Sequence, residues 1–155
     1  MNDMPDATDS GPPLDSPTSE FCLRMARAWA TLSRRLDSAL GSHHGISFAD
    51  YQLLLSLQRA EGGRLRRVDL AEKLGLTASG VTRSLLPLEK IGLVDRQSDP
   101  RDARVGYAII TPAGNELVTN AGVVVHNVSR MMLGGPSRAQ VEATSALFAQ
   151  LAGGQ

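Results

Sequence analysis

The sequence predicts a mainly α-helical protein that contains one β-hairpin. Along most of the chain after residue 18, apolar residues recur at intervals of three or four, which is the spacing of one helix face. Only residues 93–110 change to the β-branched and aromatic content that is typical of strands. Apolar residues make up 42% and charged residues 21% of the 155 residues, as in ordinary globular domains. We therefore expect one folded domain, spanning residues 19–152.

The first 18 residues are expected to form a disordered acidic tail. They contain four aspartates and four prolines, and they contain no lysine or arginine. Such a composition buries too little apolar surface to offset the entropy lost on ordering.

The first helix is expected over residues 20–40. Gly41 and the pair His43–His44 interrupt its pattern, so we expect the helix to end there. Its apolar face would consist of Cys22, Met25, Trp29, Leu32, Leu36 and Leu40.

Ser47 and Asp50 have the spacing of a capping box, which predicts the start of a second helix. This helix would run through Leu57, and Gly62–Gly63 would end it.

Two short helices are expected next, joined by a tight turn. Residues 68–74 form a two-turn apolar pattern that Gly75 closes, and Thr77 is placed to cap the following helix. This arrangement predicts a helix-turn-helix. Pro87 should bend the last turn of the second helix, because proline has no N–H to donate. The inward positions of that second helix are expected to be Ala78, Val81, Leu85 and Leu88.

Strands are expected over residues 93–97 and 104–110. Residues 98–103 between them have the composition of a turn, so the pair predicts a hairpin with a charged tip. Thr111–Pro112 then has the pattern of an N-cap followed by proline, which starts a helix to about Met132. A final helix is expected from Ser137 to about Leu151.

The charge of the chain is unevenly distributed. The chain as a whole has a formal net charge of zero, yet residues 59–104 hold ten basic and seven acidic residues. A helix-turn-helix followed by a basic-tipped hairpin is a winged helix, and the basic excess indicates an anionic partner for this segment. The pattern therefore predicts binding to double-stranded DNA.

The candidate DNA-binding residues fall into three groups by their expected contacts. Short or hydrogen-bonding side chains on the second helix would face base edges and nearby phosphates. Hairpin arginines would reach a minor groove, and basic residues around the first helix would bind phosphates. In that order, the residues are Thr77, Ser79, Gly80, Thr82 and Arg83; Arg101 and Arg104; and Arg66, Arg67 and Lys73.

Residues 68–114 resemble the multiple-antibiotic-resistance regulator (MarR) family of winged-helix repressors. The matching positions are Leu70–Ala71, Val81–Thr82–Arg83, Leu88–Glu89–Lys90, Gly92–Leu93–Val94, residues 99–104 and Thr111. The resemblance implies a cytoplasmic homodimer in which N- and C-terminal dimerisation and support helices (19–60 and 111–152) flank the winged helix-turn-helix (64–110). It also implies transcription regulation, by repression at a palindromic operator with half-sites about 10 bp apart.

The predicted wing departs from the family at one position. Many members have two consecutive arginines there, and the first often enters the minor groove. Here the first position is Ala103 and the second is Arg104, with an extra arginine at Arg101. We expect Arg101 or Arg104 to make the groove contact instead.

The resemblance also suggests regulation by a small molecule or by oxidation. Family members often release DNA when a small aromatic or anionic ligand enters a cleft, which by position would include Trp29, His43 and Tyr51. Cys22 lies where peroxide-sensing members keep a reactive cysteine. It also fits the apolar helix face, so the interpretation as an inert core cysteine is favoured and the sensor remains an alternative.

Several classes of function find no support in the sequence. No nucleophile elbow, phosphate-binding loop or metal-ligand spacing is present, so we expect neither an enzyme nor a bound metal or cofactor. His43, His44 and His126 are expected on the surface. No apolar run approaches a membrane span, and one cysteine fits a reducing cytoplasm. The alternative to a DNA regulator is a winged helix that binds another protein and has no DNA site.

Overall fold

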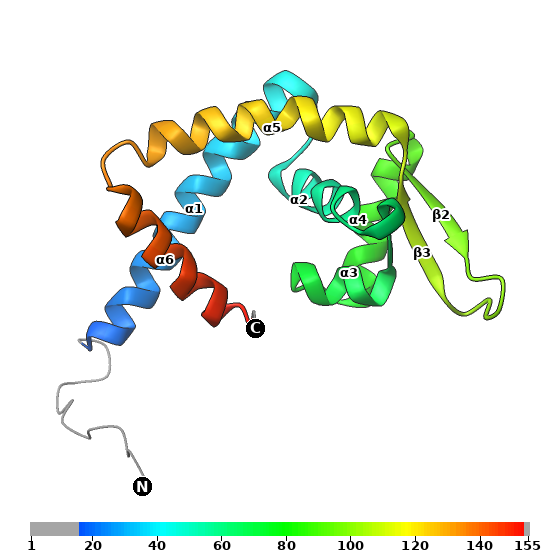
Figure 1. Ribbon diagram of the computed structural model, residues 1–155, viewed down its shortest axis with the longest axis horizontal. Helices are drawn as coiled ribbons and strands as arrows, with labels where there is room; N and C mark the ends of the chain where they lie inside the picture. The colour runs from blue at the N-terminus through cyan, green and yellow to red at the C-terminus, as the bar shows by residue number, and fades with distance from the viewer. Residues whose placement is uncertain (1–15, 154–155) are drawn as a thin grey trace, which may run out of the picture. The chain divides into compact units, whose positions relative to one another are not determined.

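The computed structural model describes residues 16–153, which divide into two compact units (Figure 1). The boundary between the units falls after Arg35, within the first helix. Residues 1–15 of the expected tail lie outside the described residues. Pro17 and Thr18 belong to helix α1 (Pro17–His44), so the last part of the predicted tail is helical.

Helix α1 continues past Gly41, where the sequence predicted its end. Near this end, the Ser42 hydroxyl donates to the Ser38 carbonyl, and His43 Nδ1 lies 2.8 Å from the Ala39 carbonyl oxygen. The chain leaves the helix only at Gly45, whose φ of +68° is a left-handed conformation that glycine adopts without strain. The predicted end was therefore wrong by one turn.

Helix α2 (Phe48–Gln58) begins with the predicted capping box. The Asp50 N–H donates to Ser47 Oγ over 3.0 Å, and the Ser47 N–H donates to Asp50 Oδ2 over 2.9 Å. The helix ends before Gly62–Gly63, which belong instead to the 3-10 turn η1 (Glu61–Gly63). This turn leads into the short strand β1 (Arg64–Arg66).

The helix-turn-helix is confirmed as α3 (Arg67–Leu74) and α4 (Ala78–Lys90). Gly75, with φ of +64°, ends α3, and Thr77 Oγ1 caps α4 by accepting from the Gly80 N–H. The buried face of α4 consists of Val81, Leu85 and Leu88.

Helix α4 differs from the expectation in its first turn. Ala78 is exposed rather than inward-facing, because the first turn of the helix extends beyond the core that covers Val81. The helix contains Pro87 and continues to Lys90, and the expected bend at its last turn stays a prediction.

The sheet has three antiparallel strands in the order β1-β3-β2, where the sequence predicted only two. Strand β2 (Val94–Ser98) and strand β3 (Gly106–Ile110) form the predicted hairpin, each starting later than expected. β1 pairs with the free edge of β3, with Leu65 opposite Ala108 and Arg66 opposite Tyr107. The hairpin extends away from helices α2, α3 and α4 (Figure 1).

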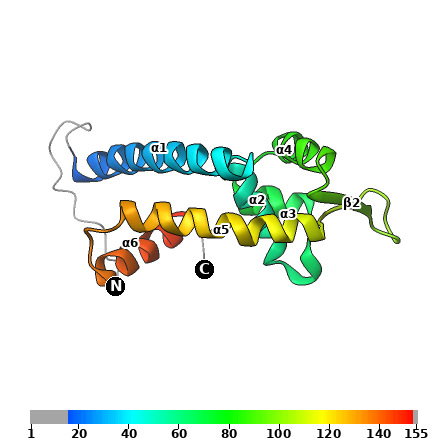
Figure 2. The ribbon, with the colours of Figure 1, turned by 90° about the horizontal axis from the view of Figure 1, so that it is seen from above.

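Helix α5 (Pro112–Met132) starts at the predicted cap, where Thr111 Oγ1 accepts from the Gly114 N–H. It packs along α2 (Figure 2). The core between these helices, the helix-turn-helix and the sheet is formed by aliphatic side chains: Leu40, Ile46, Leu53, Leu54, Leu57, Leu70, Val81, Leu85, Leu88, Val94, Ile110 and Val118.

Helix α6 (Arg138–Leu151) begins with a second capping box, formed by Ser137 and Gln140. None of its residues is buried within the chain. Among the described residues, no helix is both long enough and apolar enough to cross a membrane.

Candidate nucleic-acid interface

The N-terminus of α4 presents small hydroxyl side chains that are held by the backbone. Thr77 Oγ1 accepts from the Gly80 N–H over 3.1 Å and lies 3.2 Å from Ser79 Oγ. The Thr82 hydroxyl donates to the Ala78 carbonyl over 3.2 Å. The proton of the Thr82 hydroxyl is used in this bond, but the hydroxyl oxygen can still accept a hydrogen bond. The short side chains allow the helix backbone to approach a groove closely.

Arg83 is the long donor on the same helix. Its side chain is exposed, and within residues 16–153 it makes no hydrogen bond or ion pair. It lies on the side of α4 away from the buried Val81–Leu85–Leu88 face. A guanidinium in this position is free to donate two hydrogen bonds to one base edge.

The tip of the hairpin is ordered by two aspartates. The Arg101 N–H donates to Asp99 Oδ1 over 2.8 Å, while Asp102 Oδ1 accepts from both N and Nε of Arg104 over 3.0 and 3.2 Å. The pKa of Asp102 is lowered mainly by the hydrogen bond from the Arg104 backbone N–H, and further by the hydrogen bond from the Arg104 side chain. The Arg104 side chain is still 92% exposed, and that of Arg101 has no partner among the described residues.

The outer face of the sheet carries a polar cluster that the sequence did not reveal. The guanidinium of Arg64 lies 4.8 Å from the centre of the Tyr107 ring, and its Nη1 donates to Gln97 Oε1 over 3.2 Å. The hydrogen bond that Arg66 donates to the Tyr107 hydroxyl raises the pKa of Arg66. The Tyr107 hydroxyl in turn donates to Asp99 Oδ2 over 3.4 Å. The sequence signal for this cluster is the alternation of arginines on either side of Leu65, which is only three residues long.

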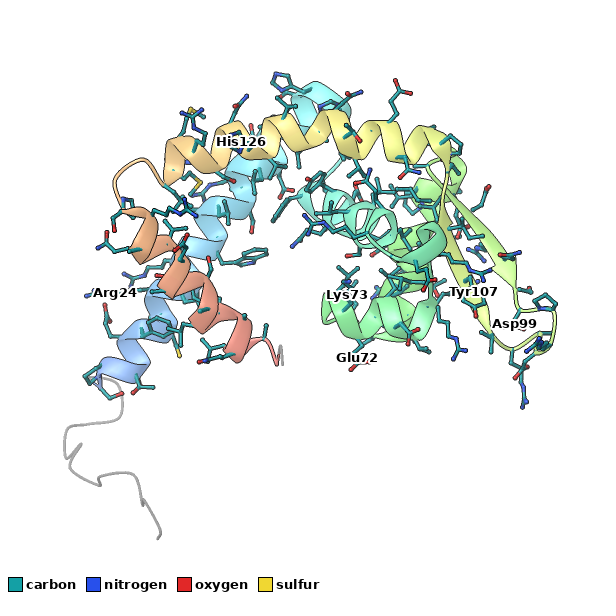
Figure 3. The ribbon with its side chains drawn as sticks, in the orientation of Figure 1. Arg24, Glu72, Lys73, Asp99, Tyr107 and His126 are labelled. Atoms are coloured by element: carbon teal, nitrogen blue, oxygen red, sulfur yellow. The ribbon has the colours of Figure 1, made fainter. Side chains whose placement is uncertain are left out.

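The three expected phosphate contacts lie in different surroundings. Arg66 is exposed on the outer face of the sheet, whereas Arg67 is half-buried against β3. Lys73 is exposed on α3 beside Glu72, and Figure 3 labels both, with Tyr107 and Asp99 on the hairpin. Arg96, on β2, is instead neutralised by Glu89 of α4 at 2.5 Å.

The three expected ligand residues belong to different compact units of the chain. Trp29 lies in the N-terminal unit and is 53% exposed. His43 is exposed and bonded to its own helix. Tyr51 is buried, with its ring stacked near that of Phe48 and its hydroxyl close to Gly122 of α5. The ligand site thus stays a prediction.

Cys22 is exposed in the chain, rather than buried as the interpretation of a core cysteine expects. His43 and His126 are exposed, as expected, but His44 is half-buried in the last turn of α1. Within residues 16–153, no three His, Cys, Asp or Glu side chains are grouped as metal ligands.

Comparison with known proteins identifies this arrangement. Residues 44–105 match the sequence profile of the MarR family. An uncharacterised HTH-type transcriptional regulator of Bacillus subtilis (strain 168), YdgJ, is 32% identical over 77 residues, which cover 50% of this chain. The match spans about half of that relative, 46% of its length.

Solved structures of similar proteins extend the likeness over nearly the whole chain. Sco3205, a MarR family transcriptional regulator from Streptomyces coelicolor crystallised in complex with DNA, is 26% identical. Its TM-score is 0.81, and the alignment covers 94% of this chain and 92% of that one. A MarR family regulator from Rhodococcus sp. RHA1 has the same fold at 22% identity, with a TM-score of 0.80 and coverage of 89% and 96%. Residues 44–105 therefore belong to the MarR family, and the chain as a whole has the fold of its winged-helix transcriptional regulators.

Proposed function

We propose that this protein is a sequence-specific DNA-binding regulator that acts as a homodimeric repressor on a palindromic operator. The observation that carries the proposal is Arg83, an exposed guanidinium with no partner in the described residues, next to the hydroxyl-rich N-terminus of α4. The DNA complex of Sco3205, whose fold this chain shares, supports the same conclusion.

In this proposal, α4 enters the major groove and the hairpin tip reaches an adjacent minor groove. Arg83 donates to a guanine edge, while the hydroxyls of Thr77, Ser79 and Thr82 contact base edges or phosphates. At the tip, Arg101 is the better placed of the two candidate arginines, because the Arg104 guanidinium is already paired with Asp102.

The terminal helices support the homodimer. On α6, Phe148 is 43% and Leu151 59% exposed, and no residue of the helix is buried within the chain. On α1, Phe21, Leu23 and Trp29 are also exposed. Apolar helix faces that the chain itself leaves uncovered are typical of faces covered by another subunit.

The test is a mobility-shift titration with the promoter region of the protein's own gene at two salt concentrations. Sub-micromolar binding that resists competitor DNA and weakens steeply with salt is expected, because each phosphate contact contributes about 0.9 to the slope of log K against log salt. Absence of any shift across a promoter library would contradict the proposal and favour the protein-interaction module.

Two substitutions separate base reading from backbone binding. Arg83→Ala should reduce discrimination between operator and random DNA, whereas Lys73→Ala should weaken binding to both by a similar factor. Equal effects of the two substitutions on both duplexes would remove Arg83 from the base-reading role.

For the hairpin, Arg101→Ala should weaken binding more than Arg104→Ala.

Release of DNA can be tested for the two suggested triggers. The thiol-based alternative requires that Cys22 reacts with peroxide. Peroxide treatment should then release DNA from the wild type but not from Cys22→Ser. A small aromatic or anionic ligand is the other trigger, and a thermal-shift screen of phenolic acids without any stabilisation would remove its support.

A further inference from the structure

Tyr107 is the centre of a row of side chains that crosses the outer face of the sheet. Arg66 of β1 and Gln97 of β2 are its partners on the two neighbouring strands. Residues directly opposite each other in antiparallel strands share one face of the sheet, so these three side chains lie on the same surface. Figure 3 shows Tyr107 on the hairpin and Asp99 nearer its tip. Tyr107 therefore lies between the strand that precedes the helix-turn-helix and the turn that forms the wing tip.

The Tyr107 hydroxyl makes hydrogen bonds on both sides. It accepts from Arg66 and donates to Asp99 Oδ2 over 3.4 Å. Because an ionised carboxylate only accepts, the single hydroxyl proton points to Asp99 and the hydroxyl oxygen stays available to Arg66. The other carboxylate oxygen, Asp99 Oδ1, accepts from the Arg101 backbone N–H over 2.8 Å. A continuous series of hydrogen bonds thus connects Arg66, at the base of the hairpin, to the backbone of Arg101 at its tip.

The second aspartate of the tip makes only local side-chain contacts. The Asp102 carboxylate accepts from the backbone and the side chain of Arg104, within the same turn. Within residues 16–153, Asp99 is thus the tip side chain whose hydrogen bonds reach β3. Without the Tyr107 hydroxyl, the remaining hydrogen bonds of residues 99–105 in the described part of the chain would join residues of the tip to one another.

We propose that Tyr107 is a positioning residue for Arg101: its hydroxyl fixes the wing tip relative to the helix-turn-helix and so orients Arg101 for the minor groove. The inference rests on the proposed DNA binding, and it assigns to Tyr107 no DNA contact of its own. An arginine on an ordered turn loses less conformational freedom on binding than one on a free turn. The narrow minor groove of A·T-rich DNA attracts arginine strongly, so an ordered Arg101 should also increase the preference for such sequences.

Tyr107→Phe tests the role of the hydroxyl, because it keeps the ring that lies 4.8 Å from the Arg64 guanidinium. We expect the full-length variant to bind a duplex from the promoter region of its own gene about fivefold more weakly, the usual effect of one lost hydrogen bond. In the Arg101→Ala background, the same substitution should change binding by less than about twofold, because its effect passes through Arg101. An equal loss in both backgrounds would overturn the proposal, since Tyr107 would then act on DNA directly or through the fold.

Gln97→Ala is the matched control on the same face of the sheet. Gln97 is the other cross-strand neighbour of Tyr107, but its Oε1 accepts from Arg64 rather than from the Tyr107 hydroxyl. Any effect of Gln97→Ala on binding should therefore add to that of Arg101→Ala. Thermal melting of every variant separates a displaced wing tip from an unfolded protein.

The preference for A·T-rich DNA provides a second measurement. Two versions of the promoter duplex are compared that differ only in having A·T or G·C pairs beside the half-sites. The wild type should prefer the A·T version, and Tyr107→Phe should lose this preference to the same extent as Arg101→Ala. A merely structural role of Tyr107 would weaken binding to both duplexes by the same factor, and this result would overturn the proposal.

The order of the wing tip can also be measured without DNA. The backbone order parameter of Arg101, from NMR relaxation, should fall in Tyr107→Phe and stay unchanged in Gln97→Ala. If the wild type binds no duplex, the proposed function fails. Normal binding by the wild type, together with an unchanged order parameter of Arg101 in Tyr107→Phe, would overturn only the role of Tyr107.

Discussion

The winged helix and the terminal helices use the same kinds of residue in opposite ways. In α2, α4 and the sheet, leucine and valine side chains are buried within the chain, as Leu54, Leu85 and Val94 illustrate. In α6, Leu147, Phe148 and Leu151 remain exposed although the helix has a well-formed N-cap. The first region is stabilised by its own core. The second has the apolar surface of a core, and the described residues do not bury it.

The largest effect is expected for a truncation in the self-contained core. Leu85→Ala should lower the free energy of unfolding by about 2–5 kcal/mol, because it removes a fully buried side chain and leaves a cavity. Urea unfolding would measure the change. Ile91→Ala, at a position that is 62% exposed, should change stability by less than about 0.5 kcal/mol. Similar destabilisation in both variants would contradict the boundary of this core.

A charge on the apolar face of α6 should act on assembly rather than on the fold. Phe148→Asp should raise the dimer dissociation constant by at least about a hundredfold, because an unpaired carboxylate would be buried between subunits. Light scattering during size-exclusion chromatography measures the change. Gln150→Asp adds the same charge to the same helix on another face, and the dimer should tolerate it. If the Phe148→Asp variant remains a dimer, the apolar face of α6 does not lie in the dimer interface and belongs to another partner.

The two capping boxes allow the regions to be compared with one chemical change. Ser47→Ala should cost about 1 kcal/mol of global stability, because α2 is part of the core. Ser137→Ala removes the same hydrogen bond from α6, whose residues are not buried within the chain. We expect it to increase amide exchange at the start of α6 with little effect on the global transition. An equal global destabilisation would show that α6 unfolds together with the winged helix.

The smallest effect is expected at the wing tip, where Asp102 is one of the two aspartates that order an exposed loop. The pKa of Asp102 is lowered by Arg104, so the ordering is fully present above the ordinary pKa of about 4. It is lost as the pH falls through the lower pKa of the folded protein. The amide signal of Arg104 in NMR spectra should follow this titration. Asp102→Asn should abolish the titration, and a pH-independent amide in the wild type would contradict it.

The elements that have a local cause could be predicted from the sequence. The caps at Ser47, Thr77 and Thr111 each depend on residues within one helical turn, and each is present in the structure. The apolar spacing of α4 likewise placed Val81 and Leu85 in the core.

The elements that depend on distant partners could not be predicted from the sequence. Strand β1 has only three residues, two of them arginines, and exists because the edge of β3, more than 40 residues later, pairs with it. For the same reason, the sequence indicated only a surface cation at Arg67. Its position against Gly106 follows from the pairing of β1 with β3. Gly41 suggested a helix end, yet the backbone bonds of α1 continue across it.

Strand β3 is hydrogen-bonded along both edges, by β1 immediately before α3 and by β2 after α4. The base of the hairpin is therefore connected to the helix-turn-helix on both sides, through β1 to α3 and through β2 to α4. With both connections intact, the hairpin base and the helix-turn-helix are expected to move together. In the proposed DNA complex, a tilt of the helix-turn-helix would therefore carry the base of the hairpin with it.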